Sequence, residues 1–353
     1  MKILVISLAG IGDTLFATPL IHELRANFPD ATIDALVRWA GAKFLENNPH
    51  LNSVYQRDLA GESKASALRF LMSLRRNGYD VSFNTHPQSN RLYRVAARVI
   101  GAPARISHEY ECSGVLDRWL VNKSIPQDYS RHAVENNLAL LPFAGAKVLL
   151  PSHRYEILLA EADKAWAENF IVREKLSGRR LLGIHTGTGA TKNLALRRWP
   201  LENYIELVRR LRQAKPELAV LFFGGPEEQR DYAQVQAVLG AGEVLFPKTE
   251  NLLQAAALIA KCDSFLSVDT ALMHVAAAMG VKNQVVIETP TWNKPIEPYG
   301  NPFTLVKNPV VAGRNLEYYR YDGGDIKGTR EELLRCMASV KVEDVFETLA
   351  RGI

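Results

Sequence analysis

An aspartate near the start of the chain stands where a buried strand would turn into a helix. The run Ile3–Leu8, aliphatic except for one serine, is typical of a strand buried on both faces, and Gly10 and Gly12 then allow a tight turn before Asp13. Apolar residues follow at helical spacing. In a parallel sheet this junction lies at the carboxyl edge, where ligands bind. Asp13 therefore has two interpretations: the N-cap of the helix, or a general base that removes a proton from a bound hydroxyl.

Patterns that are absent from the sequence narrow the chemistry. A dinucleotide fingerprint needs a third glycine three residues after Gly12, and position 15 is a leucine. The sequence has no D-x-D and no pair of histidines at metal-ligand spacing, so we expect no metal-bound diphosphate. It also lacks the G-x-S-x-G elbow and the P-loop, which argues against a hydrolase of that type and a P-loop kinase.

A loop of small residues with three cations follows a strand predicted in the second half. In GIHTGTGATKNLALRRWP the cations are Lys192, Arg197 and Arg198, and Pro200 suits the first turn of a helix that runs to Leu211. Small residues expose backbone N–H groups, so such a loop can hold a diphosphate. A solvated basic loop without a ligand has the same pattern.

Two further strand ends carry polar residues. Glu228 follows Gly-Gly-Pro at a helix start, where it either complements the helix dipole or accepts hydrogen bonds from ribose hydroxyls. Asp269 and Thr270 follow the strand predicted at 264–268, and His274 comes one helical turn later. These residues are either helix caps and core or a ligand-binding group.

One helical pattern in the first half is strongly basic. Arg91, Arg94 and Arg98 fall on one face of RLYRVAARVI, and aliphatic residues fall on another. This basic face is either simply solvated or a binding surface for an acidic partner.

Alternating strands and helices predict an α/β protein with two doubly wound parallel domains that face a central cleft. Strands are predicted at 3–8, 31–37 and 80–84 in the first half, and at 181–185, 219–223, 264–268 and 284–287 in the second. The charged helical segment 160–180 is interpreted as the bridge between the halves.

Length and composition fit this organisation. A chain of 353 residues with 47% hydrophobic and 23% charged residues is typical of a two-domain globular enzyme. The net charge of +5 suits an anionic substrate or an anionic membrane surface. The sequence has no basic tract interleaved with aromatics, which is the pattern that would indicate a nucleic-acid partner. The three cysteines lie far apart, as expected in a reducing compartment, and no apolar run of 18 residues is present.

Four stretches, in this order, resemble the bacterial ADP-heptose:lipopolysaccharide heptosyltransferases of glycosyltransferase family 9. They are GIGDTLFATP at 10–19, the basic residues before Trp199-Pro200, FGGPEE at 223–228 and VDTALMHVAAAMG at 268–280. The resemblance runs nearly end to end. It implies a GT-B fold with an acceptor-binding domain at 1–165, a nucleotide-sugar-binding domain at 166–340, and a helix at 341–353 that packs back on the first domain.

The implied reaction is metal-independent transfer of a heptosyl unit, with inversion, from ADP-L-glycero-β-D-manno-heptose to a sugar hydroxyl of the lipopolysaccharide inner core. The resemblance favours Asp13 as the catalytic base. It implies a donor site formed by Thr188, Lys192, Arg197, Glu228, Asp269, Thr270, Ala271 and His274. We place the acceptor near Gly12 and, on charge alone, near Arg91, Arg94 and Arg98. No cofactor or metal is implied besides the ADP-sugar.

Departures from the family pattern bear on the donor. Ala271 stands where the family commonly has glycine, Arg197 replaces its usual lysine, and Thr289 and Trp292 replace a glycine and an aspartate. The same fold could therefore use another nucleotide sugar, for surface polysaccharide or protein glycosylation. A catalytically weak nucleotide- or glycan-binding relative is a further alternative, and a nicotinamide-dependent oxidoreductase is disfavoured. We expect a cytoplasmic protein that touches the inner membrane surface, where an anionic glycolipid acceptor would lie.

Overall fold

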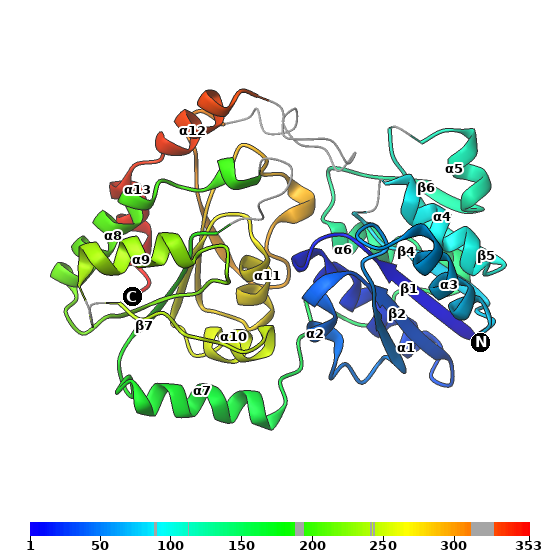
Figure 1. Ribbon diagram of the computed structural model, residues 1–353, viewed down its shortest axis with the longest axis horizontal. Coiled ribbons are helices and arrows are strands. Elements are labelled where there is room, and N and C mark those ends of the chain that lie inside the picture. Colours follow the sequence, from blue (N-terminus) through cyan, green and yellow to red (C-terminus); the bar gives the residue numbers. More distant parts are fainter. Residues whose placement is uncertain (88–89, 112, 188–193, 241, 243, 312–327) are drawn as a thin grey trace. The chain divides into compact units, whose positions relative to one another are not determined.

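The computed structural model describes residues 1–87, 90–111, 113–187, 194–240, 242, 244–311 and 328–353. These residues form two compact units, each built on a parallel sheet (Figure 1). Unit 1 contains residues 1–158 and 294–297, and unit 2 contains residues 159–293 with the described parts of 298–353.

The sheet of unit 1 has the strand order β3-β2-β1-β4-β5-β6, and all of its pairs are parallel. The central strand β1 is apolar and almost fully buried, as expected for a strand covered on both faces. The strands are β1 (Lys2–Ser7), β2 (Thr32–Val37), β3 (Ser53–Gln56), β4 (Val81–Asn84), β5 (Ala104–Glu109) and β6 (Lys123–Pro126). Ile3 pairs with Ile33 of β2 on one side and with Val81 of β4 on the other.

Helices cover both faces of this sheet. Strand order runs outward from β1 in both directions, and right-handed crossovers therefore place α3, α4 and α5 on one face. One apolar cluster joins β1 to α3 and α4 through Leu4, Leu71 and Ala97. The helices are α1 (Thr18–Asn27), α2 (Ala42–Leu45), α3 (Lys64–Arg75), α4 (Arg91–Ile100), α5 (Val115–Leu120) and α6 (Ala133–Leu138), with 3₁₀ turns η1 (Gly12–Ala17), η2 (Trp39–Gly41), η3 (Leu141–Ala144) and η5 (Lys294–Ile296).

The sheet of unit 2 has the order β11-β10-β9-β7-β8 and is also parallel. Its strands are β7 (Leu181–His185), β8 (Ala219–Phe222), β9 (Ser264–Ser267), β10 (Asn283–Ile287) and β11 (Phe303–Val306). Its helices are α7 (Glu161–Arg173), α8 (Leu201–Ala214), α9 (Gln229–Leu239), α10 (Leu252–Ile259), α11 (Ala271–Ala278), α12 (Arg330–Ala338) and α13 (Val342–Ala350), with the 3₁₀ turn η4 (Leu194–Arg197). No described helix is long and apolar enough to cross a membrane.

All seven predicted strands are confirmed to within one residue at each end, while β3, β5, β6 and β11 were not predicted. The segment 160–180 does not bridge the units, because its helix α7 packs against α10 and belongs to unit 2. The boundary predicted at 165 therefore moves to 158. Pro200 is the N-cap of α8 rather than a residue of its first turn.

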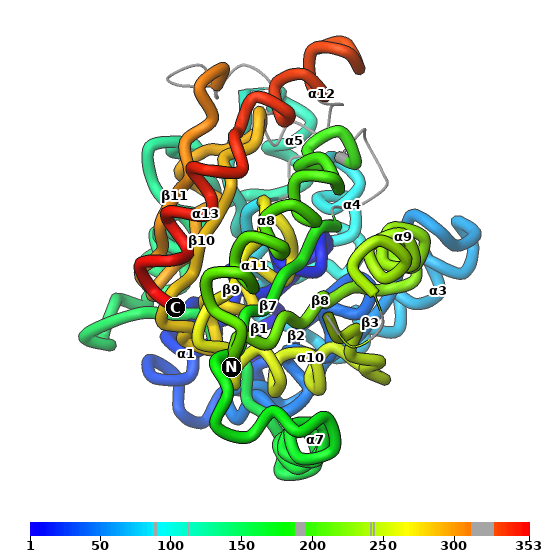
Figure 2. Tube along the Cα trace, turned by 90° about the vertical axis from the view of Figure 1, so that its left-hand side faces the viewer, coloured from blue at the N-terminus to red at the C-terminus, as the bar shows by residue number. Residues whose placement is uncertain are grey.

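The C-terminal helix corrects a second expectation. Residues 341–353 were expected to pack back on the first domain, but α13 packs against α8 of unit 2, as Figures 1 and 2 both show. Its apolar side puts Val345 and Leu349 into the core of unit 2. On the exposed side, Arg210 Nη1 of α8 lies 2.6 Å from Glu343 Oε2.

Candidate functional site

Asp13 closes the turn that follows β1. Its Oδ2 accepts a hydrogen bond from the backbone N–H of Gly10 at 2.7 Å. It does not cap a helix: the chain enters η1 first, and the N-caps of η1 and α1 are Ile11 and Ala17, neither with a side-chain cap bond. A Cβ on Gly10 would lie 2.8 Å from the same carboxylate oxygen, so a larger residue there would displace the Asp13 carboxylate. The half-buried carboxylate is thus held by the loop that precedes it, and the N-cap interpretation is wrong.

Asp13 lies at the switch point of the unit 1 sheet. The order β2-β1-β4 reverses direction between β1 and β4, which is where doubly wound sheets bind ligands. His86 follows β4 as Asp13 follows β1. It is fully buried, its backbone N–H donates to Asn137 Oδ1 at 2.7 Å, and its ring lies against Tyr110. Burial, with a further contribution from the nearby His108 and His132, holds the pKa of His86 well below the usual value for histidine.

This second polar group was missed by the sequence analysis. Its signal was available, since His86 comes two residues after the strand predicted at 80–84, as Asp13 comes after the first. Gly12, the predicted acceptor contact, is the first residue of η1 and is buried.

The prediction of a basic face on α4 needs a correction, because the central arginine of that face lies in the protein interior. Arg94 is 1% exposed, and its Nη1 donates to Asp117 Oδ1 of α5 at 2.6 Å. Arg91 contacts the other Asp117 oxygen at 3.2 Å, and Arg98 lies 4.6 Å from the ring of Trp119. Burial alone would raise the pKa of Asp117, but hydrogen bonds from Arg91, Gly114 and Arg94 lower it to about 2. The structure thus gives Arg94 a structural partner in place of a solvated binding role.

The corresponding edge of unit 2 brings Arg197 and Asp269 together. Arg197, in η4, donates from Nη1 to Asp269 Oδ2 at 2.5 Å and to Thr291 Oγ1 at 2.9 Å. Both members of the ion pair are buried. Burial raises the pKa of Asp269, and the positive charge of Arg197 opposes that shift. Two residues that the sequence analysis assigned separately to the donor site therefore form one buried ion pair.

Thr291 is a residue whose role the sequence analysis missed. It stands between Thr289 and Trp292, the two positions of this loop at which the sequence departs from the family pattern. Its hydroxyl, 3.2 Å from that of Thr289, gives the Arg197 guanidinium a second anchor, and Trp292 is buried beside Phe303. The contact to Arg197 is thus made by Thr291, which lies between the two departing residues.

The start of α11 is fixed by a second buried pair. Thr270 is the N-cap, and its Oγ1 accepts from the Met273 N–H at 3.3 Å and lies 3.0 Å from His185 Nδ1 at the end of β7. Burial, assisted by the charge of Arg198, lowers the pKa of His185 to about 3, so this imidazole is neutral. β7 and β9 are the strands between which the order of this sheet reverses. The site of unit 2 therefore also lies at a switch point.

Glu228 lies at the same edge, after β8. It is 5% exposed, and its Oε2 accepts from the Gly225 N–H at 2.8 Å. Its Oε1 lies 3.4 Å from Arg198 Nη2. Burial raises the pKa of Glu228. A Cβ on Gly187 would lie 2.2 Å from Oε1, so only glycine allows the loop after β7 to approach this carboxylate.

The remaining predicted donor residues have different positions. His274 lies on α11 and is buried, which lowers its pKa to about 3. Ala271 is the first residue of α11 and is partly exposed. Thr188 and Lys192 lie outside the described residues.

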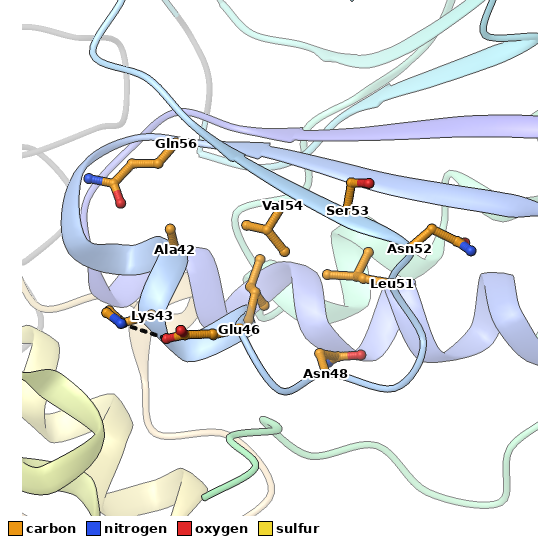
Figure 3. Close-up of a pocket in the computed structure, with 10 residues that line it drawn as sticks. Ala42, Lys43, Glu46, Asn48, Leu51, Asn52, Ser53, Val54 and Gln56 are labelled. Carbon is orange, nitrogen blue, oxygen red and sulfur yellow. Dashed lines mark hydrogen bonds and ion pairs between the residues drawn. The ribbon is translucent and has the colours of Figure 1, made fainter. Parts of the chain in front are cut away.

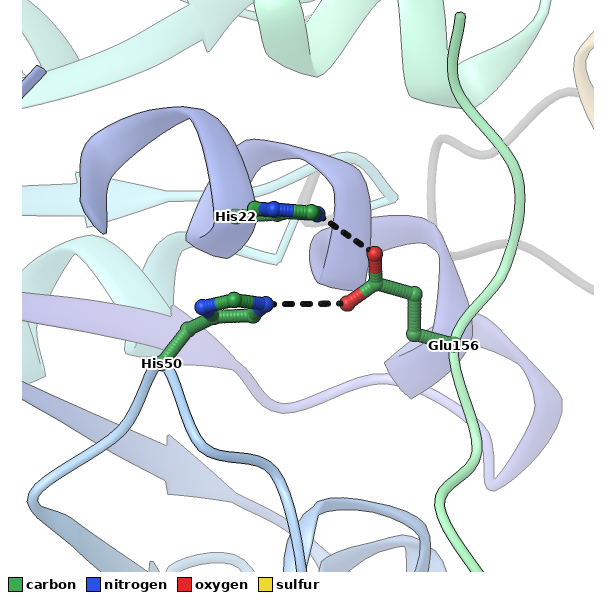
Figure 4. A group of neighbouring side chains, drawn as sticks. All are labelled: His22, His50 and Glu156. Atoms are coloured by element: carbon green, nitrogen blue, oxygen red, sulfur yellow. Dashed lines mark hydrogen bonds and ion pairs between the residues drawn. The ribbon is translucent and has the colours of Figure 1, made fainter. Parts of the chain in front are cut away.

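A group of three potential metal ligands lies elsewhere in unit 1 (Figure 4). His22 Nδ1 is 2.6 Å from Glu156 Oε1, and His50 Nε2 is 3.7 Å from Glu156 Oε2. The two imidazoles are stacked, with centroids 3.9 Å apart and planes at 15°. Parallel rings aim their nitrogens at the two oxygens of one carboxylate rather than at a common point about 2 Å away, as a zinc ion requires. This geometry fits a hydrogen-bonded group that ties the segment around Glu156 to α1.

Each unit has a surface depression. The one in Figure 3, about 330 Å³, lies between α2 and β3 of unit 1 and has no predicted site residue in its lining. A second, about 390 Å³, lies in unit 2 and is lined by Thr186, Arg198 and Trp199 together with residues of α12. The second adjoins the edge that carries Glu228 and Arg197.

Comparison with solved structures identifies the fold class. The glycosyl transferase family 9 structure from Veillonella parvula has a TM-score of 0.76 at 21% identity and covers 99% of this chain and 96% of its own. An Escherichia coli heptosyltransferase, WaaC, solved with ADP, has a TM-score of 0.72 at 18% identity, with full coverage of both chains. The fold is that of the GT-B glycosyltransferases.

The sequence places the chain within this class. The protein belongs to glycosyltransferase family 9 (heptosyltransferase), whose family model matches residues 67–319. A curated relative, lipopolysaccharide heptosyltransferase 3 of Escherichia coli K12, is 27% identical over 293 residues, which cover 78% of each chain. The resemblance inferred from four short stretches is confirmed.

Proposed function

We propose that this glycosyltransferase moves a heptosyl unit, with inversion and without a metal ion, from ADP-L-glycero-β-D-manno-heptose to a sugar hydroxyl of the lipopolysaccharide inner core. The family and the relatives named above support the sugar and the acceptor class. Within the chain, the observation that carries the proposal is the buried cation Arg197 at the switch point of unit 2.

The contacts of Arg197 suit a leaving diphosphate. Asp269 and Thr291 hold its Nη1, while its buried Nε has no hydrogen-bond partner among the described residues. A buried N–H donor without an acceptor costs about 1–3 kcal/mol, which a phosphate oxygen would recover. The N-terminus of the eight-residue helix α11 lies beside the same group and favours negative charge. Arg197 and α11 would therefore stabilise the charge that develops on ADP as it departs.

Asp13 supplies the other half of the proposed mechanism. An inverting displacement needs one base on the acceptor side, and Asp13 is a carboxylate fixed at the switch point of unit 1 by the Gly10 N–H. It would take the proton of the acceptor hydroxyl as that oxygen attacks the anomeric carbon and the bond to the diphosphate breaks.

The first experiment is calorimetric titration with ADP, UDP and GDP in buffer without metal, followed by a turnover assay with ADP-heptose. Selective ADP binding and transfer support the proposal. Preference for UDP or GDP would replace heptose with another sugar but keep the fold and the base. Binding without turnover by any donor would indicate a binding module. We further propose a cytoplasmic location in peripheral contact with the inner membrane, where the glycolipid acceptor would be reached.

A further inference from the structure

Three neighbouring helices of unit 1 share an exposed side. The helices α3, α4 and α5 follow β3, β4 and β5 in the chain, and α4 packs between the other two (Figure 1). We call their exposed side the α3–α5 face. Since α4 and α5 begin just after the carboxyl ends of β4 and β5, this face starts at the sheet edge that carries Asp13.

The α3–α5 face concentrates exposed apolar side chains. The described residues include fifteen large apolar side chains that are exposed, and seven of them lie on these helices of 12, 10 and 6 residues. They follow helical spacing and are Leu68 and Met72 on α3, Leu92 and Val95 on α4, and Val115, Leu116 and Trp119 on α5. Val115 is 84% exposed and Trp119 60%. Scattered apolar residues are normal on a surface, but such a concentration indicates an interaction site.

The same face is positively charged. Its partly or fully exposed cations are Lys64, Arg69, Arg75, Arg91, Arg98 and Arg118. The one acidic residue of the three helices is Asp117, which is 3% exposed and pairs with the exposed Arg91 as well as with the buried Arg94. Arg118 forms a weak ion pair with Glu109 of β5, in which Arg118 Nε and Glu109 Oε1 lie 3.5 Å apart. The partly or fully exposed cations of the three helices therefore outnumber their one acidic residue six to one.

We propose that the α3–α5 face docks on the surface of an anionic phospholipid bilayer. The inference deepens the proposed function and rests on it, because it assigns a surface to the peripheral membrane contact. Aromatic and aliphatic side chains enter the headgroup boundary, where tryptophan is favoured, while arginines reach the lipid phosphates. Each cation near such a surface contributes about 1 kcal/mol, which corresponds to roughly fivefold in affinity.

Charge argues against a second copy of the chain as the occupant. A two-fold interface would bring this face against itself and place the same cations opposite one another. An anionic lipid surface instead offers complementary charge over the whole area of the three helices. Its fluid headgroups also do not require a shaped groove.

The test is co-sedimentation of the full-length protein with vesicles of phosphatidylglycerol and phosphatidylcholine in equal parts, compared with phosphatidylcholine alone, without sugar nucleotide. We expect binding to the anionic vesicles that weakens as salt is raised. The variant Arg69→Gln/Arg118→Gln should bind roughly 25-fold more weakly, and Val115→Ser/Trp119→Ser should also lose binding.

Matched controls come from unit 2. Arg173 is 64% exposed beside one glutamate, as Arg118 is 68% exposed beside Glu109, so Arg173→Gln/Arg209→Gln removes the same charge elsewhere. Val172, 67% exposed on α7, is the control for Val115. Both control variants should bind vesicles as the parent protein does.

Each other outcome overturns the inference. No vesicle binding, equal binding to neutral vesicles, or equal losses in the control variants would remove the α3–α5 face as a lipid-binding surface. Dimers in sedimentation velocity that dissociate in Val115→Ser/Trp119→Ser would assign the face to a second copy. ADP titration of the same variants keeps the two proposals separate, because failure to bind ADP would contradict the donor site and leave the vesicle result standing.

Discussion

Arg197 and Asp269 lie 72 residues apart in the chain and form a buried ion pair at the carboxyl edge of the unit 2 sheet. Removing one partner of such a pair leaves a buried charge uncompensated, so either single deletion would confound binding with folding. Thr291 offers a cleaner test, because it contacts the same guanidinium nitrogen without carrying charge.

Thr291→Val should lower kcat/KM for ADP-heptose roughly 10- to 100-fold, as expected when a hydrogen bond to a charged group is lost. Arg197 would keep Asp269 but lose its second anchor, so its orientation toward the diphosphate would loosen. Steady-state kinetics measures the effect. Thr289→Val is the matched control, since Thr289 contacts Thr291 and not Arg197. Equal losses in both variants would contradict the anchoring role.

Asp13→Asn should reduce kcat at least 100-fold and leave ADP affinity unchanged. The amide oxygen of asparagine can still accept from the Gly10 N–H, so the turn is kept while the base is lost. Single-turnover assays and calorimetry separate the two quantities. A variant that turns over like the parent protein would return Asp13 to a purely structural role in its turn.

How far the sequence could predict these sites depends on whether the signal is local. Asp13 and Asp269 could be found because each follows a short strand that is almost fully buried, and strands of this kind are visible in a single stretch. β3 and β6 were missed because SVYQ and KSIP are partly exposed edge strands with no apolar run. The burial of Arg94 was not predictable, because helical periodicity placed it on a polar face and only the tertiary structure brings Asp117 over it.

The Arg94–Asp117 pair gives a stability prediction for unit 1. Asp117→Asn should lower the free energy of unfolding by about 3–5 kcal/mol, because the buried guanidinium would lose its counter-charge. Urea unfolding followed by circular dichroism measures the loss. Asp128, which pairs with Arg131 on the surface, is the control, and Asp128→Asn should cost less than about 1 kcal/mol. Similar small losses in both variants would contradict the interior role assigned to Arg94.

Gly187→Ala tests the close approach of the loop after β7 to Glu228. The new Cβ would meet Glu228 Oε1, which is buried and cannot yield without losing the Gly225 N–H or Arg198. We expect weaker ADP binding in calorimetry and a loss of about 1–3 kcal/mol in unfolding free energy. Gly225→Ala is the control, because its Cβ would lie at an ordinary 3.8 Å from the same carboxylate. ADP affinity unchanged in Gly187→Ala would exclude Glu228 from the nucleotide site.

The neutral buried histidines of unit 2 predict destabilisation in acid. Burial lowers the pKa of His274 to about 3, whereas an unfolded histidine titrates near 6.5. The folded state therefore binds fewer protons below pH 6.5, so the stabilisation is fully present above that pH and is lost as pH falls toward 3. At pH 5 the loss of unfolding free energy is about 2 kcal/mol for one such residue.

The variant His274→Gln tests this pH dependence. Its free energy of unfolding in urea should fall less steeply between pH 6.5 and 4 than that of the parent protein, by about 1.4 kcal/mol per pH unit. Above pH 7.5, where an unfolded histidine is already neutral, the two proteins should show parallel pH dependence, which provides the internal control. Parallel curves through the acid range as well would mean that His274 is protonated in the folded protein.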